Sequence, residues 1–247
     1  MATNTHQAET RLPVKDGFRF RGMETTRLET FVDAAFAFAV TLLVVGGGDS
    51  VPANFDEMIA AMNQVPAFAA SFANIMLFWY AHHIWSRRFG LDDTASVLLS
   101  LLLIFIVLVY VYPLKAIYSG AIDFFSGGYF RSYFELNSMG DLGLLFVIFG
   151  TGFASLSGII VLLNRHALAL RDELNLSELE LFDLHTEIGH WNLNVAVALV
   201  SIILAVVLPG RFVVAAGLVY CIFAIILPWH GIHRGRRRQA QFGRPGL

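Results

Sequence analysis

The sequence has little charge and almost no cysteine. Of its 247 residues, 15% are charged and 56% are hydrophobic, and the mean hydropathy is +0.63, whereas about a quarter of an average soluble domain is charged. The single cysteine, Cys221, excludes an intramolecular disulfide framework. A formal net charge of −2 without a basic stripe argues against nucleic acid as a partner. The composition therefore excludes an ordinary soluble domain and points to a membrane protein.

The few charges stand far apart and leave long charge-free windows. Five windows are long enough for the roughly 20 apolar residues of a spanning helix, and they cover 58–86, 94–114, 142–164, 188–210 and 212–233. A sixth window, 34–48, has only 15 residues. It spans a membrane only if Asp33 at its edge, and Glu29 before it, lie at membrane depth. A carboxylate at that depth is costly and is by default a functional candidate.

These windows predict an all-α integral membrane protein with six transmembrane helices. We expect the helices at 27–48, 62–86, 94–117, 140–164, 189–208 and 211–231. The chain then divides into an N-terminal arm over 1–26, a transmembrane domain over 27–231 and a basic tail over 232–247. In the arm, Phe18 and Phe20 are expected to rest on the bilayer surface. The connection 165–187 is expected to be a helical segment near the membrane surface, with a capping box formed by Ser177 and Glu180.

Lys and Arg are concentrated in alternate connections. If the N-terminus is cytosolic, the opposite side of the membrane receives only Lys115, Arg131 and Arg211. Because positive charges near span ends favour the cytosolic side, both termini are predicted to be cytosolic. The sequence thus indicates a multi-pass protein of the plasma membrane.

The short first window begins with a recognisable motif. It resembles the Arg-x-x-x-Phe-Ser-Asp opening of the bacterial potassium channels of the transmembrane protein 175 family, in which an Ala-rich helix and Thr-Leu-Leu follow. The residues that match in order and spacing are Arg27, Phe31, Asp33, Thr41, Leu42 and Leu43. Val32 replaces the motif serine.

Two later segments support the resemblance. Trp79, His82 and His83 are similar to the Trp-x-x-His-His of the family's second helix, and Pro113 stands where the family has a proline on the third. The family's asparagine on that helix is replaced here, and Ser100 is the candidate for its position.

The resemblance implies a potassium-selective leak channel and not an enzyme, with no cofactor and no metal. Four copies of the chain would surround a central pore lined by their first helices, with K⁺ ions and membrane lipids as the other partners. The bottlenecks would be rings of large apolar side chains with a threonine layer between them. Carried onto this sequence, these positions are Phe38, Thr41 and Val45.

Helix geometry agrees with this assignment. At 100° per residue, the positions of one stripe fall within about 60° of one another, and that stripe consists of Ala34, Phe38, Thr41 and Val45. Asp33 lies about 80 to 140° away from the residues of the stripe, so its carboxylate faces other helices if the stripe faces a pore. A buried carboxylate needs a partner. We expect His82 or His83 to supply it, with Arg27 compensating at the cytosolic end.

Other interpretations remain open. The stripe also fits ordinary helix packing, and a ring of Phe38 side chains is bulkier than the isoleucine or leucine usual in the family. A non-conducting membrane scaffold of the same fold and a proton or solute transporter with an Asp33–His83 relay are therefore alternatives.

Two further motifs have simpler interpretations. His185 and His190 are five residues apart, which fits a metal-binding helix face poorly. The small residues at 150, 154 and 158 favour close helix packing.

Overall fold

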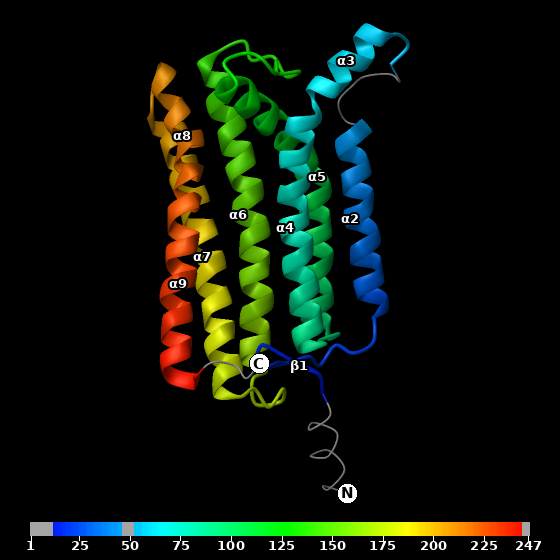
Figure 1. Cartoon of the computed structure of the whole chain (residues 1–247), viewed down its shortest axis with the longest axis vertical. Helices are drawn as coiled ribbons and strands as arrows, with labels where there is room; N and C mark the ends of the chain where they lie inside the picture. The colour runs from blue at the N-terminus through cyan, green and yellow to red at the C-terminus, as the bar shows by residue number, and fades with distance from the viewer. Residues whose placement is uncertain (1–11, 46–51, 244–247) are drawn as a thin grey trace, which may run out of the picture.

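The computed structural model describes residues 12–45 and 52–243, which form a bundle of long, nearly parallel helices (Figure 1). The main helices are α2 (Arg27–Val45), α3 (Phe55–Asn63), α4 (Val65–Phe89), α5 (Thr94–Phe125), α6 (Met139–Ala169) and α7 (Glu178–Val207). A last helical stretch consists of η1 (Gly210–Val213), α8 (Val214–Leu218), η2 (Val219–Ile222) and α9 (Phe223–Phe242). Before α2, β1 (Val14–Lys15) pairs antiparallel with β2 (Phe18–Arg19).

Polar side chains cap the starts of α5 and α7, and the sequence predicts the second of these caps. The Asp93 carboxylate accepts a hydrogen bond from the backbone N–H of Ala95 at the start of α5. Ser177 and Glu180 form the predicted capping box at the start of α7. These caps satisfy backbone donors that have no partner inside the helix.

The helical fold class is confirmed. Helical residues lie in each of the six predicted ranges, in the last of them as several consecutive pieces, and residues 46–48 of the first range lie outside the described residues. Within the described ranges, four helical stretches are long and apolar enough to cross a membrane: Thr94–Phe125, Met139–Ala169, Glu178–Val207 and Gly210–Phe242. The helix α9 crosses the expected boundary at residue 231 and continues to Phe242. The short helix α3 was not predicted.

The connection expected over 165–187 is helical at its two ends only, where the long helices α6 and α7 continue into it. The helix α6 continues to Ala169, and α7 begins at Glu178, eleven residues before the predicted start at 189. The physical reason is the cap at Ser177, together with ion pairs that satisfy the polar first turns of α7. Those turns therefore extend the bundle helix and do not form a separate element.

The larger apolar core joins α2, α4, α5, α6 and α7. Its centre contains Phe36 of α2, Phe78 of α4 and Leu103 of α5, each no more than 1% exposed. The ring of Phe78 lies edge-on to that of Phe153, with centroids 5.5 Å apart. Packing on α4 and α5 places α2 at one edge of the bundle, and α9 lies at the opposite edge beside α7 (Figure 1).

The N-terminal arm folds as a hairpin against the protein. Phe18 is 2% exposed, and its ring lies edge-on to Phe89 at 5.7 Å, with the Arg88 guanidinium 4.8 Å above it. Phe20 is half-buried. The expectation that Phe18 rests on the bilayer is therefore wrong, because the end of α4 offers the ring an aromatic and cationic partner.

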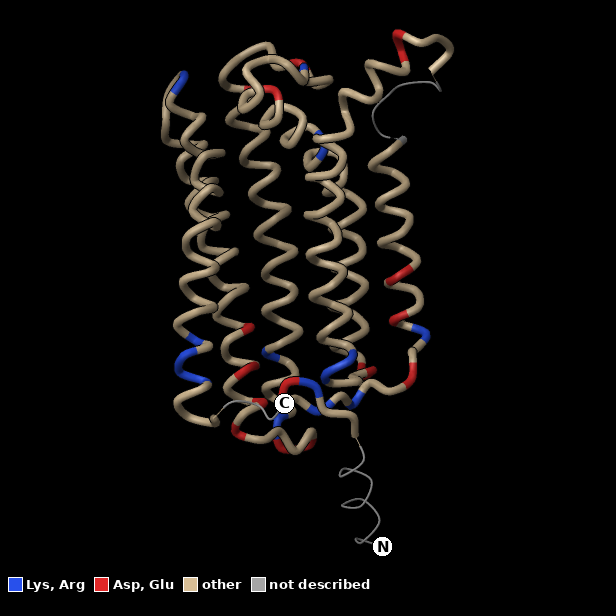
Figure 2. The backbone as a smooth tube through the Cα atoms, viewed as in Figure 1, with Lys and Arg blue, Asp and Glu red and all other residues tan. Residues whose placement is uncertain are grey.

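Charge is distributed unevenly along the bundle (Figure 2). Most of the described Lys and Arg lie at the end where α2 begins and α4 ends, which we call the basic end. Its arginines include Arg19, Arg21, Arg87, Arg88, Arg165, Arg171, Arg234 and Arg238. The first and last described residues lie at this same end (Figure 1).

Candidate functional site on the first helix

The helix α2 has two contrasting faces. Its inner face packs on α4 and α5 and consists of Val32, Phe36, Ala39 and Leu43, each no more than 1% exposed. Its outer face carries Ala34, Phe38 and Thr41, which are all exposed, with Phe38 at 55%. The side chain of Val45, the fourth predicted position, lies outside the described residues. Packing within one chain therefore does not account for the three exposed positions.

The Thr41 hydroxyl is partly satisfied within its own helix. It donates a hydrogen bond of 3.1 Å to the carbonyl of Ala37 one turn earlier. The hydroxyl oxygen keeps lone pairs that point away from this bond, and its neighbours Phe38 and Val44 are apolar and exposed. Thr41 thus supplies a polar layer on an otherwise apolar outer face.

Asp33 lies off the outer face and is held by an indole. The N–H of Trp79 on α4 donates a hydrogen bond of 2.8 Å to the Asp33 carboxylate. The expectation that His82 or His83 is the partner is therefore wrong. In the pairing of α2 with α4, Trp79 stands opposite Asp33, and His83, one turn later on α4, stands opposite Glu29.

The two histidines have separate roles. Nε2 of His82 lies 2.9 Å from Oγ of Ser100 on α5, and both side chains are buried. The ring of His83 stacks on Trp79 with centroids 5.4 Å apart. The five predicted residues Asp33, Trp79, His82, His83 and Ser100 thus join α2, α4 and α5.

Glu29 is a functional candidate that sequence reasoning placed at membrane depth without a partner. It is 3% exposed, and its carboxylate lies 3.4 Å from Nδ1 of His83 and 3.5 Å from Nε of Arg87. Its backbone N–H donates a hydrogen bond to the Thr26 hydroxyl. The signal in the sequence was Thr26 three residues before Glu29, a helix-start pattern, together with Arg87 at the end of α4.

Arg27 and Phe31 lie apart from this network. Both are exposed, on the same side of α2 as Phe38, and Phe31 is 55% exposed. Arg27 forms no ion pair with the described part of the chain, so the expected compensation of Asp33 by Arg27 is not observed there. The motif therefore supplies Asp33, which bonds α4, and two exposed residues, Arg27 and Phe31.

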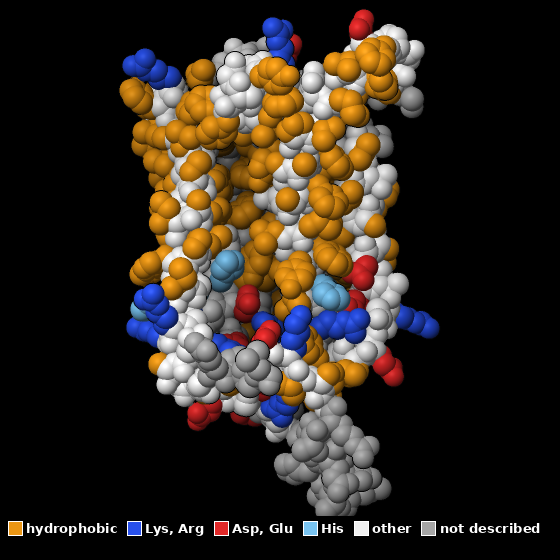
Figure 3. Space-filling model, in the orientation of Figure 1, with side chains coloured by type: hydrophobic (Ala, Val, Ile, Leu, Met, Phe, Trp, Pro, Cys, Tyr) orange, Lys and Arg blue, Asp and Glu red, His pale blue; other side chains and the backbone are white. Residues whose placement is uncertain are grey.

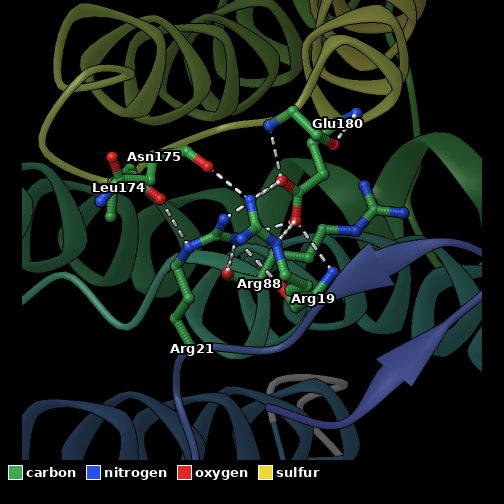
Figure 4. A network of polar contacts seen from close by, with 7 residues as sticks. Arg19, Arg21, Arg88, Leu174, Asn175 and Glu180 are labelled. Carbon is green, nitrogen blue, oxygen red and sulfur yellow. Dashed lines mark hydrogen bonds and ion pairs between the residues drawn. The ribbon is translucent and has the colours of Figure 1, made fainter. Parts of the chain in front are cut away.

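A second polar network fastens the hairpin before α2 (Figure 4). Glu180 at the start of α7 is fully buried, and its carboxylate accepts bonds from Arg19 Nη2 at 2.7 Å and from Arg21 Nη1 and Nη2 at 3.1 Å. Arg21 Nε donates to the carbonyl of Leu174, and Arg19 bonds the carbonyl of Asn175. The sequence identified Glu180 as a cap, and its arginine partners, 159 and 161 residues away, were missed.

The other sequence candidates have ordinary surroundings. In the ranges 12–45 and 52–243, no three His, Cys, Asp or Glu side chains come together to hold a metal. His185 bonds the carbonyl of Leu181 in its own helix. A methyl group added at Gly150 would meet Ile202 at 2.8 Å, so this glycine allows α6 to pack closely on α7. A methyl group added at Gly158 would have no atom within 4 Å, so the close packing predicted from the spacing is observed at Gly150 and not at Gly158.

The chain is similar to proteins named as potassium channels. The family model of the endosomal/lysosomal potassium channel TMEM175 matches residues 27–113. A protein of Marivirga tractuosa named potassium channel is 34% identical over 227 residues, which cover 89% of this chain and 91% of that relative.

Two solved structures are similar as well. The crystal structure of a single-substitution variant of the potassium channel MtTMEM175, in complex with a nanobody–MBP fusion, has 31% identity and a TM-score of 0.77, and the match covers 91% of this chain and 100% of that one. A lysosomal potassium-selective channel TMEM175 homolog from Chamaesiphon minutus has 18% identity and a TM-score of 0.55 over 85% of this chain and 97% of that one, and it supports the fold alone. On the extent of the Marivirga match, this chain belongs to the TMEM175 family.

Proposed function

We propose that the chain is one subunit of a homotetrameric, potassium-selective leak channel of the plasma membrane, with its pore lined by α2. The observation that carries this proposal is the outer face of α2, where Ala34, Phe38 and Thr41 are exposed on a helix at the edge of the bundle. Relatives named as potassium channels support the choice of ion. We assign the chain no catalytic step.

The architecture of the proposed channel follows from this face. A single α2 cannot enclose a pore, so several copies must bring their outer faces together. Six spans, α2, α4, α5, α6, α7 and the part of the last helical stretch up to residue 231, would place both ends of the chain on one side of the membrane. The basic end is assigned to the cytosol by the positive-inside rule, with 1–26 as the arm, 27–231 as the channel domain and 232–247 as the tail.

Phe38 is the proposed constriction, and Thr41 the polar layer beside it. A ring of large apolar side chains narrows a pore and closes it by dewetting, and the threonine hydroxyls offer oxygen atoms to a partly dehydrated cation. Val45 is the proposed next apolar ring. Asp33 is held by Trp79 on another side of the helix, which favours an anchor over a proton relay.

Flux through reconstituted protein tests the proposal. K⁺ flux into liposomes is expected to rise several-fold in Phe38→Ala, because the smaller side chain widens the constriction. Phe105→Ala is the matched control, since Phe105 is 62% exposed on α5, away from the proposed pore. Sodium and proton flux are measured in parallel to establish selectivity.

Each other outcome contradicts a part of the proposal. Unchanged flux in Phe38→Ala removes Phe38 from the constriction. An absence of ion flux in the parent and in both variants favours the non-conducting scaffold, and K⁺ flux that requires a proton gradient favours a transporter.

A further inference from the structure

A cavity of about 370 Å³ lies between α4, α6, α7 and α9. On α4 it is lined by a different side of the helix from Trp79 and His83, which face α2. Figure 3 shows the hollow between α9 and α4, with hydrophobic side chains along its upper part and histidine and charged side chains at its lower end. The proposed ion path does not use this space.

The lining of the cavity changes from apolar to polar along the bundle. On α4 it extends from Leu77 to Arg88, a rise of about 16 Å in a helix. Leu77 and Ile84 line the apolar part, and Arg88 lies at the basic end, where α7 contributes Glu187 and His190. The cavity is therefore elongated and amphipathic, with its polar part toward the basic end.

The polar part has an excess of positive charge. Arg88 Nη1 lies 3.5 Å from the Glu187 carboxylate. Arg234 of α9 lies beside the cavity and donates a bond of 2.8 Å to Thr186, which lines it. The ring of His230, another lining residue, is 6.4 Å from that of His190. Asp183 also lies near Arg234, but it is paired with Arg238 at 2.7 Å. Three arginines, Arg88, Arg234 and Arg238, therefore stand against two carboxylates, and this excess of positive charge favours a bound anion.

The apolar part faces the surroundings of the bundle. Leu77 is 41% exposed and Tyr80 is 57% exposed, so the cavity opens sideways where lipid chains would lie. A small soluble anion would leave this apolar wall uncovered, whereas an acyl chain would cover it. Pockets of about 300 Å³ or more hold small ligands, and basic pockets between membrane helices on the cytosolic side bind lipid head groups.

We propose that this cavity is a binding site for an anionic phospholipid of the cytosolic leaflet. Its phosphate lies beside Arg88, His190 and His230, and one acyl chain lies along Leu77 and Ile84. The placement in that leaflet rests on the orientation given under the proposed function. Binding itself does not depend on ion conduction.

Filling the cavity provides the first test. Gly231 lines it, and no atom lies within 4 Å of a methyl group added there, so Gly231→Leu occupies the cavity without a clash at Cβ. Gly235→Leu is the matched control, one turn further along α9, equally free of neighbours and outside the lining. Binding of phosphatidylglycerol to the full purified chain in detergent is measured by native mass spectrometry.

Gly231→Leu is expected to weaken phosphatidylglycerol binding about tenfold, and Gly235→Leu to leave it unchanged. Equal binding of phosphatidylglycerol by the two variants would show that the lipid does not bind in this cavity. Because this measurement involves no flux, it is independent of the test of the channel, and either proposal can fail alone.

The second test addresses the head group. Arg88→Gln is expected to weaken phosphatidylglycerol binding, and Arg236→Gln, which removes an exposed arginine of α9 outside the lining, to leave it unchanged. Zwitterionic phosphatidylcholine that binds as tightly as phosphatidylglycerol overturns the anionic preference. Glycerol phosphate is the soluble competitor. If it competes as well as the intact lipid at equal concentration, the ligand is a soluble anion and the proposal of a lipid ligand is wrong. If Arg88→Gln does not fold, the comparison of Gly231→Leu with Gly235→Leu still tests whether the lipid binds in this cavity.

Discussion

At the scale of single residues, the anchor of α2 depends on which side chains meet between helices. Asp33 accepts the N–H of Trp79, and Glu29 lies 3.4 Å from His83 one turn away along both helices. These two contacts fix the rotation of α2 about its axis relative to α4. They thereby keep Phe38 and Thr41 on the exposed side.

Removal of the indole N–H tests the Asp33 anchor. Trp79→Phe keeps an aromatic ring against His83 but leaves the Asp33 carboxylate without its donor, and it is expected to lower the free energy of unfolding by about 1–3 kcal/mol. The midpoint of thermal unfolding in detergent measures the loss. Trp229→Phe is the control, because Trp229 is 65% exposed. Equal midpoints for the two variants would show that the bond contributes nothing.

At the scale of elements, the hairpin of β1 and β2 joins α7 to the start of α2. Glu180 of α7 holds Arg19 and Arg21, and Arg21 is followed within six residues by the first residue of α2. The backbone N–H of Gly22 also bonds the carbonyl of Arg87 at the end of α4. The entry into α2 is therefore held by two other helices of the bundle.

Glu180→Gln tests this attachment. The variant leaves two arginines facing a neutral amide, and breaking a buried ion pair costs on the order of 3 kcal/mol. The hairpin is expected to loosen first, because Glu180 is the carboxylate that pairs with both of its arginines. Trypsin should therefore cut after Arg19 or Arg21 faster than in the parent chain.

Glu178→Gln is the matched control, since Glu178 occupies the exposed first position of the same helix. Its cleavage rate should equal that of the parent. If Glu180→Gln is cut no faster than Glu178→Gln, the hairpin is held by other contacts, such as the packing of Phe18 on Phe89.

At the scale of the whole molecule, the outer face of α2 predicts how copies of the chain meet. Phe31 and Phe38 are each 55% exposed on a helix that the family match includes. A lipid-facing helix would tolerate this exposure, whereas a pore requires the faces of several copies to converge on one axis. The two arrangements differ in the distance between equivalent residues.

Cysteine cross-linking distinguishes the two arrangements. In a Cys221→Ser background, which removes the only native cysteine, Phe38→Cys is expected to form disulfide-linked dimers on oxidation in membranes, because a disulfide needs Cα atoms about 4.4–6.8 Å apart. Phe105→Cys on α5 is the control and is expected to stay monomeric. Cross-linking of the control alone would place α5, and not α2, nearest the axis.

The sequence predicted the helices more accurately than the contacts between them. The charge-free windows located each long helix because a spanning segment excludes charge over a fixed length. The early start of α7 was missed because Glu180 and its neighbours are satisfied by residues far away in the chain. For the same reason the position of Phe18 was wrong, since its partners are on α4.

Charge spacing and helical period are enough to identify a helical membrane protein with a motif on its first helix, and to place Ala34, Phe38 and Thr41 on one side of that helix. The exposure of this side, the bond from Trp79 to Asp33 and the amphipathic cavity behind α4 are evident only in the folded chain. The physical reason is that hydropathy and helical period are local properties of the chain. Hydrogen-bond partners and cavities depend instead on the register at which distant helices pack.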